Sequence, residues 1–374
     1  MNMNMKWRKA CTAGLACIAL LVGASACGSS QAKADDNSKT ATSVADFGGM
    51  DGLVKAAKAE GSLTLIACPD DWANWGNIIK AFQDKYGITV NSTNPEASSA
   101  EEIKAAKDLK GQATAPDVLD LGPAVASTST DYFAPYKVSA WDQIPEANKQ
   151  PDGLYVNDYT GVMSIGYDSS KVPEPKTVDD LLKPDYKGKV ALNGDPTQAG
   201  AAFAAVAWVT LQQGGSLDDF QTGIDFFDKL NKAGNFIPVD ATSATIASGE
   251  TPVVIDWNYL NVAAAKQNAN YKTVVIPKDA YGSYYNQAIN KDAPHPAAAR
   301  LWEEFLFTPE AQNMFLEAGA LPVLAKSMKE DGTIDEKALQ AAGGLPESIN
   351  TATQSQIDAA NKLLAEKWST IAAS

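Results

Sequence analysis

Two hydrophobic periods alternate along the chain and predict a succession of strands and helices. A β-prone run at 63–67 precedes apolar residues at helical spacing over 75–86, and a second β-prone run follows at 88–93. A strand, a helix and a strand in this order make a βαβ unit, which predicts a parallel sheet. The same patterns predict further strands at 117–122, 163–167, 189–193, 251–256 and 273–276, and helices at 99–110, from about 198 to 211, and at 221–231, 259–267, 296–306, 309–317 and 354–368.

A proline-containing break at 172–175 separates two sets of these elements. Each set alternates strands and helices, so the predicted fold class is α/β with two lobes, each a mainly parallel sheet flanked by helices. Ligand loops in such folds follow the carboxyl ends of the strands. We therefore expect a ligand to bind at the open edge between the two lobes.

The N-terminal segment has the features of an export signal. Lys6, Arg8 and Lys9 precede an apolar run at 10–22, which is shorter than the roughly 20 residues of a membrane span. Small residues then lead directly into Cys27, and this resembles the lipobox of bacterial lipoproteins, although Ala24 stands where a leucine is usual. The resemblance implies that Cys27 carries a lipid anchor. The alternative is an ordinary signal peptide followed by an incidental cysteine.

Charge and rare residues exclude several functions. The formal net charge is −14, and removing the three basic residues of 1–26 leaves −17 for the rest of the chain. Arginine occurs only at Arg8 and Arg300, and His295 is the only histidine. So acidic a chain is a poor candidate for binding nucleic acid, and it lacks guanidinium groups for clamping phosphates or carboxylates. A single histidine also excludes a multi-histidine metal site.

Cysteine usage agrees with an exported protein that is stabilised by its core. Cys11 and Cys17 lie in the signal and Cys27 is the predicted anchor, which leaves Cys68 without a partner for an internal disulfide. Residues 28–42 are polar and poor in bulky apolar side chains, so they are expected to form a flexible tether.

The C-terminal third carries a family signature. The stretch 294–312, which reads PHPAAARLWEEFLFTPEAQ, and the following Gly319–Pro322 resemble the signature of extracellular solute-binding proteins, the receptors of bacterial ABC importers. The segments 61–94, 116–120 and 186–190 also match. The resemblance implies a type II periplasmic-binding fold that closes around a small-molecule solute and presents it to an ABC permease and its ATPase. Within the family, the chain is most similar to the cluster that binds polyamines, ferric iron, thiamine and related solutes.

The resemblance also implies an organisation of the whole chain, with hinge strands near 159–167 and 281–289. The expected parts are a lipoprotein signal peptide at 1–26, a lipid-anchored tether at 27–44, the first part of lobe 1 at 45–160, lobe 2 at 161–280, and a hinge return with C-terminal helices packing on both lobes at 281–374.

The loop after the first strand contains the candidate ligand residues Asp71 and Trp72. An aromatic residue in this loop resembles the polyamine receptors, and a cationic amine is attracted by carboxylates and by aromatic faces. The structural alternative is that Asp71 caps the next helix and Trp75 belongs to the core. Trp72 precedes the apolar stripe and is the better candidate for a ligand contact.

Two further candidates in the first lobe are Ser98 and Asp120. Ser98 opens a helix with Glu101 three residues later, which is the pattern of a capping box and favours a structural role, although the family places this loop at the cleft. Asp120 ends a strand at the same rim, where it is a candidate partner of a cation or, equally, a turn-forming acid.

In the second lobe the candidates are Thr197, Gln198, Asp256 and Trp257. Thr197 and Gln198 precede a helix N-terminus, where free N–H groups favour an anionic or polar ligand atom. Simple capping by Asp195 is the alternative. Trp257 follows a strand, as the second aromatic residue of the polyamine receptors does, and is the strongest candidate of all.

Tyr284 and Tyr285 are the candidates in the second hinge strand. The polyamine receptors carry an acid where this chain has Tyr285, which weakens a strict spermidine or putrescine assignment. Paired tyrosines invite a ferric site, but the ferric receptors place theirs in the preceding loop, where only Tyr259 occurs here.

The resulting expectation is a monomeric receptor without catalytic activity, cofactor or metal centre. It is anchored through Cys27 at the outer face of the cytoplasmic membrane, or is periplasmic if the envelope has two membranes. A cationic or zwitterionic solute is expected, with a polyamine-like one favoured. The alternatives are a receptor for ferric iron, thiamine or an aminophosphonate, and, from a different class, a cell-surface glycosidase with paired carboxylates.

Overall fold

The first strand–helix–strand unit forms as its sequence pattern predicts. β1 (Ser62–Ile66) lies parallel to β2 (Thr89–Thr93), and α3 (Trp75–Tyr86) connects them. Gly87 ends α3 with a φ of 67°, a left-handed conformation that glycine adopts without steric cost. The face that α3 buries is the predicted apolar stripe of Trp75, Ile78, Ile79 and Phe82.

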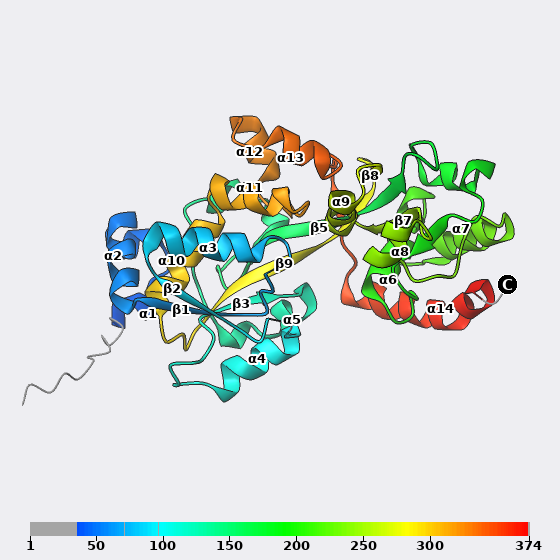
Figure 1. Ribbon diagram of the computed structural model, residues 1–374. Helices are drawn as coiled ribbons and strands as arrows, with labels where there is room; N and C mark the ends of the chain where they lie inside the picture. The colour runs from blue at the N-terminus through cyan, green and yellow to red at the C-terminus, as the bar shows by residue number, and fades with distance from the viewer. Residues whose placement is uncertain (1–35, 71, 96, 373–374) are drawn as a thin grey trace, which may run out of the picture. The chain divides into compact units, whose positions relative to one another are not determined.

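The computed structural model describes residues 36–70, 72–95 and 97–372 (Figure 1). The other strands of this part are β3 (Val118–Leu121), β4 (Phe133–Ala134), β5 (Val156–Asp168), β6 (Val190–Leu192), β7 (Val253–Trp257), β8 (Tyr271–Val274), β9 (Ala280–Asn290), β10 (Leu321–Pro322) and β11 (Ile349–Asn350). The other α-helices are α1 (Asp36–Thr40), α2 (Met50–Glu60), α4 (Ser99–Asp108), α5 (Pro123–Thr128), α6 (Gly200–Gln212), α7 (Gln221–Lys232), α8 (Ser243–Ser248), α9 (Asn258–Gln267), α10 (Pro296–Leu306), α11 (Pro309–Glu317), α12 (Ala325–Asp331), α13 (Glu336–Ala341) and α14 (Gln354–Ala372). Short 3-10 helices span Val44–Phe47, Thr130–Tyr132, Trp141–Gln143, Glu146–Asn148, Val178–Leu182 and Pro184–Tyr186.

The long strands β5 and β9 join two parallel parts of one mixed sheet. The strand order is β2-β1-β3-β9-β5-β7-β6, in which β2-β1-β3 and β6-β7 are parallel. β9 pairs antiparallel with β3 and β5, and β5 pairs antiparallel with β7. Figure 1 shows β5 and β9 running between the two groups of helices.

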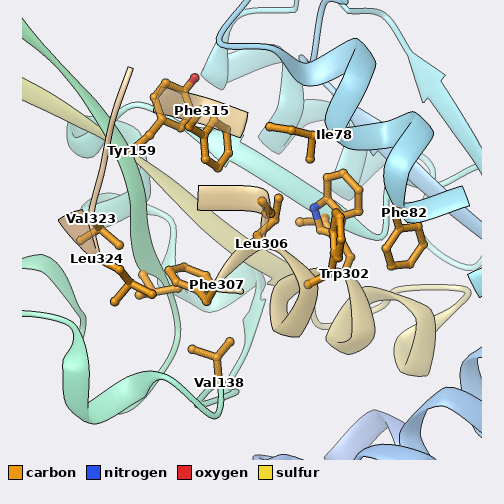
Figure 2. Packing of buried hydrophobic residues seen from close by; sticks show 14 of the residues in the cluster. Ile78, Phe82, Val138, Tyr159, Trp302, Leu306, Phe307, Phe315, Val323 and Leu324 are labelled. Carbon is orange, nitrogen blue, oxygen red and sulfur yellow. The ribbon is translucent and has the colours of Figure 1, made fainter. Parts of the chain in front are cut away.

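The first core cluster fills one face of the β2-β1-β3 part of the sheet. Trp302 of α10 stacks on Trp75 of α3 with ring centroids 5.9 Å apart, and Phe315 of α11 meets Trp75 edge-on at 5.1 Å. Figure 2 shows Tyr159 of β5 beside Phe315 in the same cluster. Helices that follow β9 in sequence therefore pack on strands that precede it.

The second core cluster covers the β6-β7 part of the sheet. α6 is buried on most of its surface, from Ala202 through Thr210 apart from the half-buried Phe203, and a helix that is apolar all round belongs to an interior. α14 adds Leu364 and Trp368, and the Trp368 ring lies 5.4 Å from that of Phe227. Smaller apolar clusters lie at Ile66, Ala106, Leu119, Leu121, Ala126, Phe133 and Ala288, and at Ala191, Ala241, Ile246, Val254, Ala264 and Tyr271.

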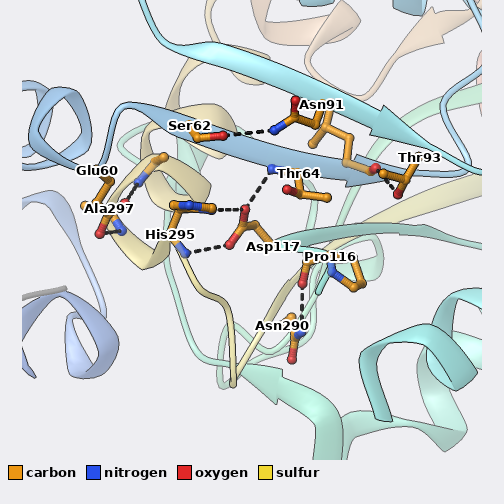
Figure 3. Close-up of polar contacts among 12 residues, drawn as sticks. Glu60, Ser62, Thr64, Asn91, Thr93, Pro116, Asp117, Asn290, His295 and Ala297 are labelled. Atoms are coloured by element: carbon orange, nitrogen blue, oxygen red, sulfur yellow. Dashed lines mark hydrogen bonds and ion pairs between the residues drawn. The ribbon is translucent and has the colours of Figure 1, made fainter. Parts of the chain in front are cut away.

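Buried polar contacts tie α10 to the first strands (Figure 3). Asp117 accepts hydrogen bonds from the backbone N–H groups of Thr64 and His295, each at 2.7 Å, and its Oδ2 lies 2.8 Å from His295 Nδ1. Glu60 accepts the free N–H groups of Ala297 and its neighbour at the start of α10, at 3.0 and 2.8 Å. The only histidine therefore has a structural environment.

Arg300 ties α10 to the first residues of the described chain. Its side chain is 1% exposed. Nε donates to the carbonyl of Ala41 at 2.8 Å, Nη2 to that of Lys39 at 3.0 Å and Nη1 to that of Pro296 at 2.9 Å. Carbonyl oxygens thus bond a buried guanidinium to which none of the carboxylates in the described part of the chain is bonded.

Most predicted elements are present, and several bounds agree to the residue. The helices predicted at 296–306 and 309–317 are α10 and α11, and the strand at 163–167 is the second half of the longer β5. α2 was not predicted. No helix among the described residues is both long and apolar enough to cross a membrane.

Candidate functional site

A cavity of about 530 Å³ lies where β5, β7 and β9 approach the start of α6. Its walls come from residues that pack on both core clusters, with Trp72 and Tyr285 on the first and Trp257 and Phe203 on the second. The residues that line it are Trp72, Gly161, Pro196, Thr197, Gln198, Ala199, Gly200, Ala201, Phe203, Ala204, Trp257, Tyr259, Tyr281, Ser283, Tyr285, Ile357 and Asn361. Among these described lining residues there is no acidic or basic side chain.

Four aromatic rings form a continuous wall of this cavity. Trp257 and Tyr259 lie parallel, with centroids 6.4 Å apart and planes inclined by 6°. Tyr259 is tilted by 59° against Trp72 at 5.3 Å, and Trp72 meets Tyr285 edge-on at 6.0 Å. We call Trp72, Trp257, Tyr259 and Tyr285 the aromatic wall.

Tyr159 fixes the position of two rings of this wall. Its hydroxyl accepts a hydrogen bond of 2.8 Å from Nε1 of Trp72 and donates one of 3.4 Å to Oδ2 of Asp120. Its ring stacks on Tyr285 at 5.3 Å, with planes inclined by 15°. Trp72 therefore has its only polar atom satisfied on the protein side.

Glycine in β5 makes room for the rings from the second lobe. A Cβ on Gly161 would lie 2.5 Å from Cε1 of Tyr259 and 3.1 Å from Cε3 of Trp257. Real Cβ atoms essentially never lie within 3.0 Å of another heavy atom, and a contact of 3.1 Å is tighter than ordinary van der Waals packing. The absence of a side chain at Gly161 therefore allows the aromatic wall to pack directly on the strand.

The loop before α6 supplies the polar side of the cavity. Oδ1 of Asp195 accepts the backbone N–H and the hydroxyl of Thr197, both at 2.7 Å, and Thr197 and Gln198 line the cavity. The N-cap residue of α6 is Ala199, which has no side-chain cap, so the alternative that Asp195 caps this helix is wrong.

Three buried carboxyl groups lie behind the aromatic wall. Asp120, Asp158 and Glu102 are all less than 5% exposed. Gln287 donates to Asp120 at 2.9 Å and to Asp158 at 3.1 Å, and Glu102 accepts the N–H of Asp120 at 2.8 Å. Burial raises the pKa of Glu102 to about 9 and that of Asp158 to about 7. Burial and the two neighbouring carboxyls raise the pKa of Asp120 well above its ordinary value.

Asp120 and Asp256 are among the predicted ligand residues, but neither lines the cavity. Asp256 is 4% exposed and accepts hydrogen bonds from Asn193 at 3.0 Å and from the N–H of Trp257 at 2.8 Å. Burial raises its pKa to about 7. Both carboxyls thus have protein partners in the interior.

Two further candidates lie elsewhere. Ser98 is exposed and forms the predicted capping box with Glu101 at the start of α4. Tyr284 lines a different cavity, of about 690 Å³, because neighbouring residues of β9 point to opposite faces. The candidates that the structure brings together are Trp72, Thr197, Gln198, Trp257 and Tyr285.

Asp71 and Cys27 lie outside the described residues. The N-cap residue of α3 is Asn74, so the capping role considered for Asp71 is wrong, whereas Trp75 is fully buried as the core alternative predicted.

The candidate ligand residues did not include the lining residues Tyr281, Ser283 and Asn361, and Tyr259 was considered only for a ferric site. Ser283 was detectable, because it is two residues from Tyr285 in a strand and therefore shares its face. Asn361 comes from α14, and no local pattern connects that helix to the cavity. Among the residues that the structure describes, no group of three or more His, Cys, Asp or Glu is placed to hold a metal ion.

The two-part mixed sheet, the pair of crossing strands and the cavity between the clusters define a type II periplasmic-binding fold. Residues 124–341 match the profile of the family described as bacterial extracellular solute-binding protein. Since this match spans more than half of the chain, the protein belongs to that family. The predicted family and fold class are both confirmed, and the family consists of solute-binding proteins. No curated protein matches the chain in sequence.

Solved structures show the same fold at low sequence identity. A candidate extracellular solute-binding protein from Bordetella parapertussis has a TM-score of 0.65 and 14% identity. The spermidine/putrescine ABC transporter substrate-binding protein from Streptococcus pneumoniae has a TM-score of 0.60 and 17% identity. A ferric binding protein from Campylobacter jejuni has a TM-score of 0.57 and 16% identity. Each match covers 83% of this chain and 99% of the other.

Proposed function

We propose that this protein is the solute receptor of an ABC importer, and that it captures a small organic cation or zwitterion for delivery to a permease and its ATPase. The family supports a receptor, and the resemblance to an ABC substrate-binding protein supports this type of transporter. One observation carries the choice of solute: an aromatic wall lines the cavity, and its described lining has no charged side chain. Ring faces attract cations electrostatically.

A solute with a single cationic group fits this site better than the polyamine that the sequence favoured. Each ammonium group of a polyamine needs a counter-charge or several acceptors once it leaves water. Asp120 and Asp256 were the expected counter-charges in the described part of the site, and both are bonded internally away from the cavity. The presence of Tyr285 where the polyamine receptors carry an acid also argues against a polyamine.

A zwitterion is included because the cavity also borders the start of α6. Gly200 and Ala201 of its first turn line the cavity, and the N-cap residue Ala199 has no side chain able to bond the free N–H groups. The helix dipole favours a negative group at this end. A carboxylate or phosphonate at α6 and a cation at the aromatic wall would be complementary to the two sides of the cavity.

The proposal extends to the location of the receptor. A lipid on Cys27 would hold a monomeric protein at the outer face of the membrane, close to its permease. Radiolabelled palmitate should be incorporated into the protein and not into the Cys27→Ala variant, which should no longer be recovered with the membranes. Incorporation into both proteins would contradict the anchor assignment.

A ligand panel tests the function. Purified protein should show a higher melting temperature and saturable calorimetric binding with at least one member of a panel of choline, glycine betaine, thiamine, 2-aminoethylphosphonate and putrescine, and the bound solute should be recovered unchanged. Chemical conversion of the solute would favour an enzyme. Absence of binding by every organic member would contradict the proposal.

Ferric iron is a second candidate because three phenols, Tyr259, Tyr281 and Tyr285, line the cavity. Burial raises the pKa of Tyr285 to about 12 and that of Tyr259 well above its ordinary value, so an iron site would have to offset costly deprotonation of both. A coloured complex with ferric citrate that is lost in Tyr259→Phe would favour this candidate and contradict the organic cation.

A further inference from the structure

The aromatic wall can distinguish one class of ammonium ion from another. A primary ammonium has three N–H donors, and each loses a hydrogen bond to water when the group enters an apolar site. A fully methylated ammonium has no donor, so it retains its positive charge without requiring acceptors. Contacts between such groups and aromatic cages are a general mode of recognition.

The acceptors that the described lining offers are neutral. Thr197 already donates its hydroxyl to Asp195 at 2.7 Å and accepts Nε2 of Gln198 at 3.3 Å. Trp72 and Trp257 have no acceptor, since an indole N–H only donates. The remaining polar side chains of the lining carry hydroxyl or amide groups, such as Ser283 and Asn361. These groups can accept single hydrogen bonds but supply no counter-charge to a primary ammonium.

The ring geometry suits a rounded cation better than a flat ligand. Trp257 and Tyr259 are parallel with centroids 6.4 Å apart, whereas insertion of a planar ligand between two rings needs at least about 7 Å, or two contacts of about 3.5 Å. Trp72 is inclined to Tyr259 by 59° and to Tyr285 by 79°. Faces with such different inclinations are complementary to a compact group that is approached from several sides.

The aromatic wall is also held in place by the protein itself. Tyr159 bonds Trp72 and stacks on Tyr285, and the bare Cα of Gly161 lies under Tyr259. Side chains that are already ordered lose little entropy when a ligand binds. The wall therefore needs no ligand-induced assembly in order to present its faces.

We infer that the cavity binds a quaternary, fully methylated ammonium group in preference to a primary amine. This inference rests on the proposed function, because it specifies the chemistry of the cation that the receptor captures. The observations behind it are the aromatic wall, in which Trp72 is inclined to both Tyr259 and Tyr285, and the absence of a carboxylate from the described lining.

Two matched pairs of ligands test the preference by calorimetry on the purified protein. Choline is compared with ethanolamine, and glycine betaine with glycine, so that only the methyl groups differ within a pair. The quaternary member of at least one pair should bind about tenfold or more tightly than its partner, the scale of a desolvated cation–π contact. Choline should also bind about tenfold more tightly than 3,3-dimethylbutan-1-ol, its uncharged analogue.

The outcomes separate this inference from the proposed function. Equal or tighter binding of the primary amines, or of putrescine, would overturn the preference and leave the organic-cation receptor intact. Equal binding of choline and its uncharged analogue would overturn the role of charge. If neither these ligands nor any organic member of the panel above binds, both proposals fail.

Variants locate the preferred cation at the aromatic wall. Trp257→Ala should weaken binding of the quaternary ligand by about 10- to 30-fold, and Trp257→Phe should restore most of it. Trp141→Ala is the matched control, since Trp141 is half-buried, contacts Lys137 and Lys149, and lies outside the cavity. An unchanged affinity in Trp257→Ala, or an equally large loss in Asp71→Asn, would overturn recognition by a wall without carboxylates.

Discussion

The hydroxyl of Tyr159 connects the surface of the cavity to the buried carboxyls. It accepts from Trp72 and donates to Asp120, so a single atom orients an aromatic face and satisfies an interior acid. A residue of this kind acts on a ligand through the ring that it holds. Its contribution to affinity is therefore separable from its contribution to stability.

Tyr159→Phe should show that separation. The variant keeps the stacking on Tyr285 but leaves Nε1 of Trp72 without its acceptor, so we expect a loss of about 1–3 kcal/mol in the free energy of unfolding. Affinity for the solute should fall by about three- to tenfold. Tyr136→Phe is the control, because it removes a buried hydroxyl bonded to Glu304 at 2.9 Å outside the cavity. It should cost stability alone, whereas a loss of affinity in both variants would refute the positioning role.

Glu102→Gln should change how stability depends on pH. Burial raises the pKa of Glu102 to about 9 from an ordinary 4.5, so between these values the folded protein keeps a proton that the unfolded chain has released. The carboxyl therefore lowers stability progressively as pH rises through this window. Gln does not titrate. The free energy of unfolding measured in urea should therefore rise for the variant relative to the parent as pH increases from about 5 to about 9.

Glu101→Gln is the matched control with the opposite sign. The N–H of Ser98 lowers the pKa of Glu101 below its ordinary value, so this carboxylate stabilises the fold above that value and loses its effect as pH falls. The Glu101→Gln variant should therefore have a lower free energy of unfolding than the parent at high pH. Parallel pH profiles for the two variants would contradict the assignment for Glu102.

Aromatic residues at strand ends were the part of the site most accessible from sequence. Trp72 and Trp257 follow predicted strands, where the loops of an α/β fold surround a ligand, and both line the cavity. Acids at similar strand ends were predicted to face the ligand, but Asp120 faces the interior. Its orientation depends on hydrogen bonds with Gln287 and Tyr159, which are far away in sequence. Tyr284 was assigned without using the alternation of its strand.

At the scale of elements, the rings of Trp257 and Tyr259 pack against β5 at Gly161. Gly161→Ala should push Tyr259 and Trp257 out of position, because the added methyl would lie 2.5 and 3.1 Å from their rings. Solute affinity should fall by about tenfold or more, in line with an overpacking cost of about 1–3 kcal/mol.

Gly166→Ala in the same strand provides the comparison. Its Cβ would lie 2.1 Å from Oδ1 of Asn261 and 2.3 Å from the hydroxyl of Tyr271, so thermal stability should fall. Neither contact lines the cavity, and affinity measured below the melting temperature should be preserved. A similar loss of affinity in both variants would indicate a general effect of disturbing β5.

Local patterns predicted amphipathic helices well and the long strands less well. α3 and α10 have a strong apolar stripe and clear boundary residues, Gly87 for the first and Pro296 for the second. β5 begins seven residues before the predicted strand. The pattern missed this first half because it buries polar residues such as Asp158 and Thr160. Their hydrogen-bond partners are not visible in a hydrophobic pattern.

At the scale of the whole molecule, we expect the net charge to affect the association rate of the solute more than its dissociation rate. Residues after 26 carry a net −17, which attracts a cation over distances that salt shortens. The association rate of a cationic solute in stopped flow should fall as salt rises from about 0.01 to 0.1 M, because the Debye length falls from about 30 to 10 Å. Dissociation should change less, and the uncharged analogue of choline should show no such dependence.

The order of the sheet is the feature that no local reading supplies. β9 lies between β3 and β5 although more than a hundred residues separate it from either. The βαβ pattern predicted parallel neighbours correctly, but it holds no information on a strand that returns from the far end of the chain. Only the resemblance to a family implied that two strands cross between the lobes.

Burial of Arg300 has a practical consequence for following the protein in solution. Arg300 is the only arginine after residue 26, so it forms the only cleavage site there for an arginine-specific protease. The residue is 1% exposed, and its guanidinium is bonded to three carbonyls. An arginine-specific protease should leave the native body whole and cut it once, before Leu301, when α10 opens. The yield of two fragments then reports the population of that opening, and a bound solute that slows the cut would show that α10 is coupled to the distant cavity.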